Sequence, residues 1–134
     1  MKIFLAYRFI GEDIGELSDN LEKIRAGLEG AGHQVLCPFW RHDFFVQQNY
    51  DRRQIMEYSH EEIDRADLFL AFIKSSARSE GMLLEAGYAL AKNKPVITAV
   101  KKDAETTFLR DLADRVIEFD DLENLLGQLK ELSC

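Results

Sequence analysis

The residues best suited to chemistry lie in one short run, S-E-G-M-L-L-E, from Ser79 to Glu85. Apolar and small residues surround Glu85 in an expected helix, so its carboxylate is predicted to lie partly desolvated near the core. Ser79 and Gly81 open that helix, where free backbone N–H groups attract an anion and glycine permits close backbone approach. Each residue could instead have a purely structural role. Glu85 could form an ion pair with Lys92 or an Arg, and Ser79 could serve as no more than the helix N-cap. Their combination favours a functional carboxylate beside an anion site.

The segments that must position this run alternate between strands and helices. Short apolar runs predict strands at residues 2–7, 34–39, 68–73, 95–100 and 115–119. Helical spacing predicts helices at residues 14–31, 51–66, 79–93, 107–113 and 122–132, whereas residues 40–50 are expected to form an irregular loop. Strands that are apolar on both faces favour a parallel sheet covered by helices on each side. The expected fold is α/β, with a flavodoxin-like, doubly wound sheet of five strands in the order 2-1-3-4-5.

Ligands of such sheets bind at the carboxyl ends of the strands, near the reversal in strand order. Segments 7–11, 74–81 and 101–107 are expected to meet there. The sequence has no G-x-x-x-x-G-K or G-x-G-x-x-G loop for a nucleoside triphosphate or a dinucleotide. His33, His42 and His60 lack metal-ligand spacing and are expected at the surface, so neither a metal nor a cofactor is predicted.

Composition narrows the classes of protein and partner. The 134 residues contain 17 Lys and Arg against 24 Asp and Glu, a net charge of -7, which disfavours binding to nucleic-acid polymers. The length predicts a single domain over residues 1–134. The apolar runs are far shorter than the ~20 residues needed to cross a bilayer, and no signal-peptide pattern opens the chain. A cytoplasmic protein without membrane association, with two reduced cysteines, is expected.

The motif S-x-G-x-x-x-E-x-G-x-A over residues 79–89, followed by K-P-V-I, resembles the nucleoside 2-deoxyribosyltransferase family and the related deoxynucleoside 5′-monophosphate N-glycosidases. The opening strand and I-x-x-A-D before the third strand extend the resemblance over most of the chain. In that family the Glu of the motif is the nucleophile, which implies that role for Glu85. A carboxylate can stabilise the positive sugar formed when an N-glycosidic bond breaks, and trap it as an ester. The resemblance implies a nucleoside or nucleotide substrate contacted by Ala6, Tyr7, Arg8 and Gly81.

The resemblance also indicates that the substrate carries a phosphate group. The deoxyribosyltransferases commonly carry Asp at the position of Ser79, whereas the monophosphate glycosidases carry a phosphate-binding Ser, so Ser79 favours a nucleotide. The resemblance implies that Thr106 contacts phosphate from a neighbouring subunit, and a homodimer or larger oligomer is expected. Thr106 could equally cap a helix. Trp40, Phe44 and Phe45 could stack on a base or only close the core.

One position departs from the family pattern. Family members usually carry an Asp in the helix before the third strand that protonates the leaving base, and Ser59 stands at this position. A hydroxyl is a poor general acid. We therefore expect Glu57 or His60 to supply the proton.

Two other interpretations of the sequence stay open. The segment from Ile3 to Arg8, followed by Glu12-Asp13 and by a Ser ahead of a helix Glu, also resembles a TIR domain. Such a domain would cleave NAD, whose nicotinamide leaves without a proton, or act in signalling. The chain could also be a non-catalytic nucleotide-binding module in which Glu85 only closes a pocket. The run E-x-G-x-A-x-A-x-x-K-P-V-I favours the deoxyribosyltransferases.

Overall fold

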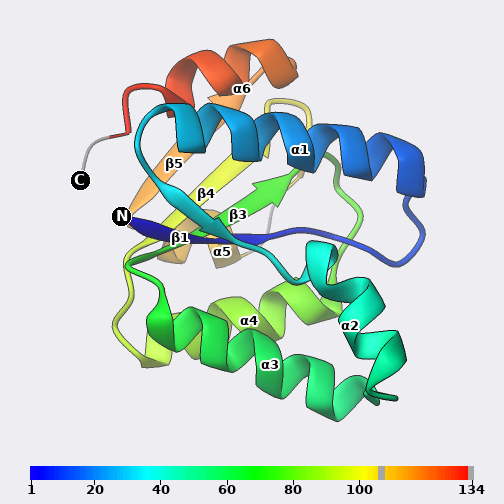
Figure 1. Cartoon of the computed structure of the whole chain (residues 1–134). Helices are drawn as coiled ribbons and strands as arrows, with labels where there is room; N and C mark the ends of the chain where they lie inside the picture. The colour runs from blue at the N-terminus through cyan, green and yellow to red at the C-terminus, as the bar shows by residue number, and fades with distance from the viewer. Residues whose placement is uncertain (106–107, 133–134) are drawn as a thin grey trace.

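The structure is a computed structural model that describes residues 1–105 and 108–132. A sheet of five strands lies at its centre: β1 (Lys2–Ala6), β2 (Gln34–Leu36), β3 (Leu68–Ile73), β4 (Val96–Lys101) and β5 (Arg115–Phe119). Neighbouring strands are all parallel, and their order is β2-β1-β3-β4-β5 (Figure 1). The predicted α/β fold and strand order are therefore confirmed.

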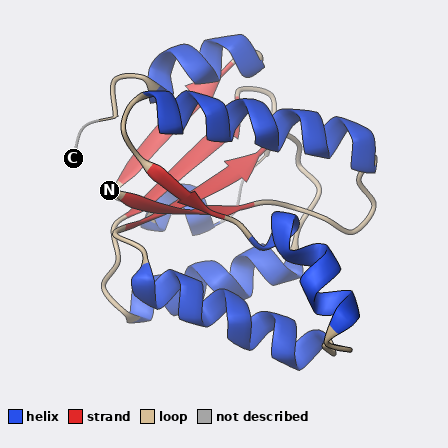
Figure 2. Ribbon diagram, in the orientation of Figure 1, coloured by secondary structure: helices blue, strands red, loops and turns tan. Residues whose placement is uncertain are grey.

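Helices cover both faces of this sheet, as Figure 2 shows. On one face lie α1 (Ile14–Gly30) and α6 (Leu122–Leu129), and on the other lie α3 (Arg52–Arg65), α4 (Glu80–Ala91) and α5 (Phe108–Leu112). Large aliphatic side chains fill the core beneath α1, whereas alanines contribute much of the core beside α3 and α4. Small side chains let those two helices approach the sheet closely. Within the described ranges, no helix has the length and apolar character needed to cross a membrane.

The prediction of an irregular loop at residues 40–50 is wrong. A 3-10 turn, η1 (Pro38–Arg41), leads directly into a helix, α2 (His42–Gln47). Phe44 and Phe45 both pack against Tyr50 and against Tyr58 of α3. This segment is ordered by tertiary contacts among aromatic rings, which a search for helical spacing in the sequence does not detect.

Capping side chains fix where the helices of the site begin. Asp51 accepts a hydrogen bond from the Gln54 backbone N–H at 2.8 Å, and the Gln54 side chain accepts one from the Asp51 N–H at 2.9 Å. Ser79 accepts from the Met82 N–H at 3.1 Å. The predicted starts of α3 and α4 are confirmed, and Glu85 is thereby placed in the second turn of α4.

Two of the three histidines predicted at the surface are covered. His33 is 5% exposed, and its Nε2 donates a hydrogen bond to the Leu132 carbonyl oxygen at 3.0 Å. His60 is half-buried, with its ring stacked on that of Tyr88. His33 therefore joins the chain's two ends, a long-range role that residue spacing does not reveal.

Candidate active site

Glu85 projects from an otherwise apolar stretch of α4 and is largely withdrawn from solvent. Burial and, to a smaller extent, the charge of Glu62 raise the pKa of Glu85 to about 7, although a hydrogen bond from Ser59 opposes the shift. Ser59 belongs to α3, the helix that packs beside α4. A carboxyl group with this pKa changes its protonation state near neutral pH, as catalytic acids and nucleophiles often do.

Four further groups are coupled electrostatically to this carboxyl, and we call the five together the carboxyl cluster: Tyr7, Cys37, Ser59, Glu62 and Glu85. Burial raises the pKa of Tyr7, and the charges of Cys37, Glu85 and Glu62 raise it further. Burial likewise raises the pKa of the Cys37 thiol, with Glu62 and Glu85 adding to the shift and Arg25 opposing it. Residues that follow β1 and β2 and residues of α3 and α4 therefore shift one another's pKa values.

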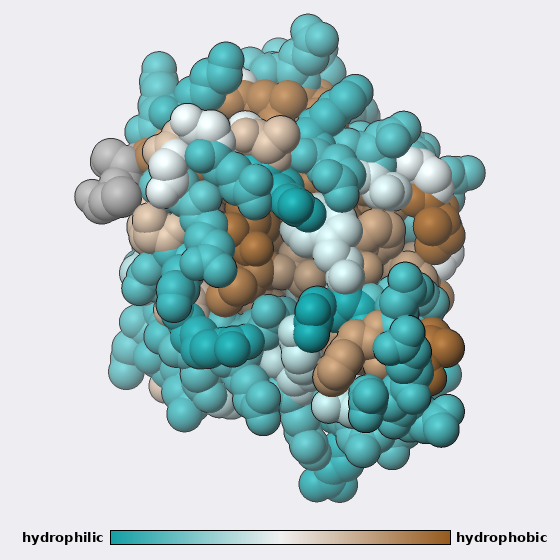
Figure 3. All heavy atoms as spheres, viewed as in Figure 1, coloured by the Kyte–Doolittle hydropathy of each residue, from teal (hydrophilic) through white to brown (hydrophobic). Residues whose placement is uncertain are grey.

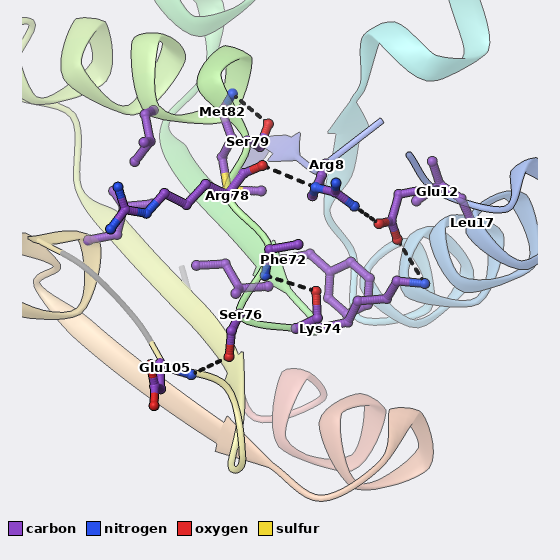
Figure 4. Close-up of a pocket in the computed structure, with 15 residues that line it drawn as sticks. Arg8, Glu12, Leu17, Phe72, Lys74, Ser76, Arg78, Ser79, Met82 and Glu105 are labelled. Carbon is purple, nitrogen blue, oxygen red and sulfur yellow. Dashed lines mark hydrogen bonds and ion pairs between the residues drawn. The ribbon is translucent and has the colours of Figure 1, made fainter. Parts of the chain in front are cut away.

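A pocket opens at the carboxyl ends of β1 and β3, shown in Figure 4. The residues of the carboxyl cluster are not among those that line it, but Tyr7 directly precedes the lining residue Arg8, and the lining residues Met82 and Leu83 lie on the same helix as Glu85. Arg8 extends across one wall, where its Nε donates to the Arg78 carbonyl oxygen at 3.0 Å and its guanidinium group pairs with Glu12. Lys74 Nζ lies 2.9 Å from the other Glu12 oxygen. Although burial opposes it, the hydrogen bonds and charges of Lys74 and Arg8 hold the pKa of Glu12 below its ordinary value.

The opposite wall of the pocket is formed by the loop from β3 to α4. Ser76 accepts a hydrogen bond from the Glu105 backbone N–H at 2.8 Å, which ties this loop to the segment after β4. Ser79 caps α4 at the pocket edge, with its hydroxyl hydrogen still free to donate. A Cβ on Gly81 would meet no atom within 4 Å, so open space lies in front of the first turn of α4. A cap, a helix N-terminus and Arg78 are therefore arranged around room for an anion.

The loop between Arg8 and Glu12 adds an apolar surface next to the pocket. Phe9 is 46% exposed and Ile10 is 81% exposed. In Figure 3, hydrophobic atoms also gather over α2, amid a mostly hydrophilic face. The walls of the pocket itself combine cations and hydroxyls with other apolar side chains, among them Phe72 and Met82, which could contact a flat ring.

The structure brings together some, but not all, of the residues that the sequence singled out. Tyr7, Ser59 and Glu85 are neighbours in the cluster, whereas Arg8 and Ser79 line the pocket. The side chain of Ala6 is 1% exposed in the core, so it does not line the pocket.

Three aromatic residues that the sequence singled out are not among those that line this pocket. Trp40 packs edge-on against Phe39, and the Arg25 guanidinium group lies over its ring, 4.7 Å from the ring centre. Its Nε1 is buried and has no hydrogen-bond partner within residues 1–105 and 108–132. Phe44 and Phe45 contribute to the packing of α2 against α3. Thr106 lies outside the described residues.

The two expected proton donors, Glu57 and His60, lie in different surroundings, and His60 Nε2 is buried without a hydrogen-bond partner among the described residues. The Glu57 side chain is 60% exposed and pairs with Arg53. The ring of His60 stacks on Tyr88, at 4.0 Å between centres, and it is not among the groups that shift the pKa of Glu85. Sequence reasoning missed Glu62, which is 5% exposed. Its spacing of three residues from Ser59 and its position directly before the apolar Ile63 were the available signals.

Comparison with known proteins gives a family match and structural neighbours. Residues 3–126 match the model of a family described as nucleoside 2-deoxyribosyltransferase. Curated protein sequences yield no match. The structure of a CMP N-glycosidase from Clostridium botulinum is 21% identical, with a TM-score of 0.74, over 98% of this chain and 100% of that one.

Two 2-deoxyribosyltransferase structures are also similar to this chain. The enzyme from Bacillus psychrosaccharolyticus is 22% identical, with a TM-score of 0.70 over 96% of each chain. The enzyme from Leishmania mexicana is 20% identical, with a TM-score of 0.63 over 98% of this chain and 99% of that one. At these identities the neighbours show a shared fold over nearly the full length.

Proposed function

The chain belongs to the nucleoside 2-deoxyribosyltransferase family, and we propose that it breaks the N-glycosidic bond of a nucleoside 5′-monophosphate with Glu85 as nucleophile. The observation that carries this proposal is the Glu85 carboxyl itself, held in the second turn of α4 with a raised pKa and Ser59 within hydrogen-bonding reach. Because the chain belongs to a family of enzymes that act on nucleosides, a catalytic function is favoured over a module that only binds nucleotides.

In the first step a Glu85 oxygen attacks C1′ of the sugar. The C1′–N bond breaks, its electron pair passes to the base, and the base takes up a proton as it leaves. The product is a glycosyl ester on Glu85, which water or a second base then resolves at C1′. Only the ionised Glu85 can attack, so the rate should rise as pH increases through about 7.

The substrate's phosphate is assigned to the pocket edge at the start of α4. The N-terminus of this 12-residue helix presents backbone N–H groups, and Ser79 keeps a hydroxyl hydrogen to donate. Arg78 and Arg8 supply positive charge beside it. The Clostridium botulinum neighbour is named for a nucleoside monophosphate, which agrees with this choice.

We also assign to the protein a homodimer or larger assembly. Exposed apolar side chains lie on α4 and α5, where Leu84 is 56% exposed, Phe108 is 76% exposed and Leu112 is 55% exposed. Apolar side chains clustered on neighbouring elements are typical of protein interfaces. An interface there would place α5 against a second subunit. The family resemblance implies that Thr106, which lies outside the described residues, contacts phosphate from a neighbouring subunit.

The experiment that tests the function is release of free base from a panel of substrates. Deoxynucleosides, nucleoside and deoxynucleoside 5′-monophosphates and NAD are each incubated with the protein, and rapid quenching followed by mass spectrometry seeks a sugar phosphate on Glu85. We expect base release from a monophosphate and an adduct at Glu85. Nicotinamide release from NAD, with no turnover of any nucleotide, would instead support the TIR-like function.

A further inference from the structure

Helix α3 contributes a second buried carboxyl group to the cluster, that of Glu62. This residue is 5% exposed, and its Oε1 is buried without a hydrogen-bond partner among the described residues. Arg65 Nη2 lies 3.8 Å from Oε2, but the Arg65 side chain is itself 60% exposed. A buried carboxyl oxygen without a partner is unfavourable for folding, so its presence calls for a role other than stability.

The position of Glu62 on α3 directs it toward the proposed reaction. Glu62 follows Ser59 by three residues, so the two side chains lie on the same face of the helix. Ser59 hydrogen-bonds to Glu85, and the charge of Glu62 acts on Glu85 as well. Both residues of α3 therefore face the nucleophile, one as a hydroxyl and the other as a carboxyl.

We propose that Glu62 is the general acid that protonates the leaving base while Glu85 attacks the sugar. This inference rests on the proposed function. As the Glu85 oxygen bonds to C1′, the C1′–N electron pair moves into the base, and the proton of the Glu62 carboxyl passes to the base atom that gains charge. Glu62 is left as a carboxylate. If water is the acceptor, that carboxylate takes a proton from the water as its oxygen bonds to C1′ and the Glu85 ester opens.

The charged and titratable groups around Glu62 support a protonated state. Burial raises the pKa of Glu62, whereas the positive charges of Arg65 and Arg41 oppose the shift. The other groups facing it are Glu85, Tyr7 and Cys37. Because two carboxyls in one buried site do not ionise independently, the pair titrates as a unit and retains one proton to higher pH than either would alone. The reactive form is the one in which that proton is on Glu62.

The test compares two leaving groups in Glu62→Gln, with Glu61→Gln as a matched control because Glu61 is exposed on the same helix. One substrate is the monophosphate that the wild-type protein cleaves, and the other carries 4-nitrophenolate in place of the base, which leaves without a proton. Glu62→Gln should lower kcat/KM on the nucleotide by about 10²- to 10⁴-fold and alter the nitrophenyl substrate by less than about threefold. Glu61→Gln should leave both unchanged.

The pH profile and a second variant supply independent readouts. With the nucleotide, the wild-type rate should fall at alkaline pH as Glu62 deprotonates, and this alkaline limb should be absent with the nitrophenyl substrate. In Glu62→Gln the alkaline limb should also be absent with the nucleotide, whereas the acid limb should stay near the pKa of Glu85, because Glu62 is uncharged in the reactive form. The double variant Ser59→Asp, Glu62→Gln places a carboxyl where relatives carry their donor, and should recover part of the lost rate.

The results that would overturn this inference can be distinguished from the result that would overturn the proposed function. Equal losses on both substrates would reduce Glu62 to a structural or electrostatic role, and full activity of Glu62→Gln on the nucleotide would exclude it as the acid. Either result overturns this inference while leaving Glu85 as nucleophile. Absence of base release by the wild-type protein from every substrate would overturn the proposed function, and this inference with it.

Discussion

The side chains of two glutamates in this protein are almost equally buried, but their pKa values are shifted in opposite directions. The side chains of Glu12 and Glu62 are 7% and 6% exposed. Although burial opposes it, Lys74 and Arg8 hold the pKa of Glu12 below its ordinary value. One carboxyl oxygen of Glu62 is buried and has no hydrogen-bond partner in the part of the chain that the structure describes, and the other lies 3.8 Å from Arg65. Burial raises the pKa of Glu62. The partners of a covered carboxyl, more than its exposure, decide whether it keeps a proton.

The contrast indicates that Glu12 has a structural role, whereas Glu62 and Glu85 are suited to proton transfer. Glu12 forms ion pairs with Arg8 and with Lys74 and thereby fixes the loop after β1 in one wall of the pocket. Glu62 and Glu85 have no such cationic partners at hydrogen-bonding distance among the described residues. The pKa of each is raised, and Glu85 can accept and release a proton near neutral pH.

The largest expected effect is on the rate, when Glu85 is replaced. Glu85→Gln keeps the size of the side chain but cannot form the glycosyl ester, so base release should fall by at least about 10³-fold. Steady-state release of free base measures this loss, with far-UV circular dichroism as the check on folding. Glu80→Gln, on the exposed first turn of α4, is the matched control and should retain activity. Near-normal turnover by Glu85→Gln would exclude this residue as nucleophile.

The next effect concerns stability. The pKa of Glu85 is raised to about 7, so the stability contributed by its protonated form is fully present below the ordinary pKa of Glu and is lost as pH rises through about 7. Glu85→Gln should therefore be more stable than the wild-type protein at pH 8, by about 2–3 kcal/mol. Urea unfolding at pH 5 and pH 8 measures the difference, which should be much smaller at pH 5. A variant less stable at pH 8 would contradict the raised pKa.

Glu12→Gln should change stability in the opposite direction. The lowered pKa of Glu12 means that its stabilisation is present above the ordinary pKa of Glu and is lost as pH falls through the folded value. At pH 7 we expect a loss of about 1–2 kcal/mol, since hydrogen bonds to charged groups are lost and Arg8 is left without its partner.

A pH series of urea unfolding curves tests this sign. The difference from the wild-type protein should shrink below about pH 4. Glu16→Gln is the matched control, because Glu16 also pairs with Lys74 but is 61% exposed. It should cost less than about 0.5 kcal/mol. Equal losses from the two variants would remove the distinction between a covered and a surface ion pair.

The fold and part of the site could be predicted because their signals are local. Strands that are apolar on both faces require a sheet covered on each side, and an acidic residue amid apolar helix positions identified Glu85. The helix at residues 42–47 could not be found in this way, because the packing of Phe44 and Phe45 on Tyr58 orders it. Glu62 resembled a surface charge in the run S-H-E-E-I-D-R, and only the packing of α3 reveals that it is buried.

The smallest expected effect separates two roles of Ser79, as cap and as anion ligand. Ser79→Ala removes the acceptor for the Met82 N–H, so it should lower stability by about 1 kcal/mol and also weaken phosphate binding. Ser79→Asp keeps a capping oxygen but places negative charge where the phosphate is assigned. Both variants should raise KM for the monophosphate by about tenfold, whereas only Ser79→Ala should lower the Tm. Turnover of the phosphate-free nucleoside is the control, and Ser79→Asp should leave it unchanged. An unaltered KM for the monophosphate in Ser79→Asp would mean that Ser79 only begins the helix, and that the phosphate binds elsewhere.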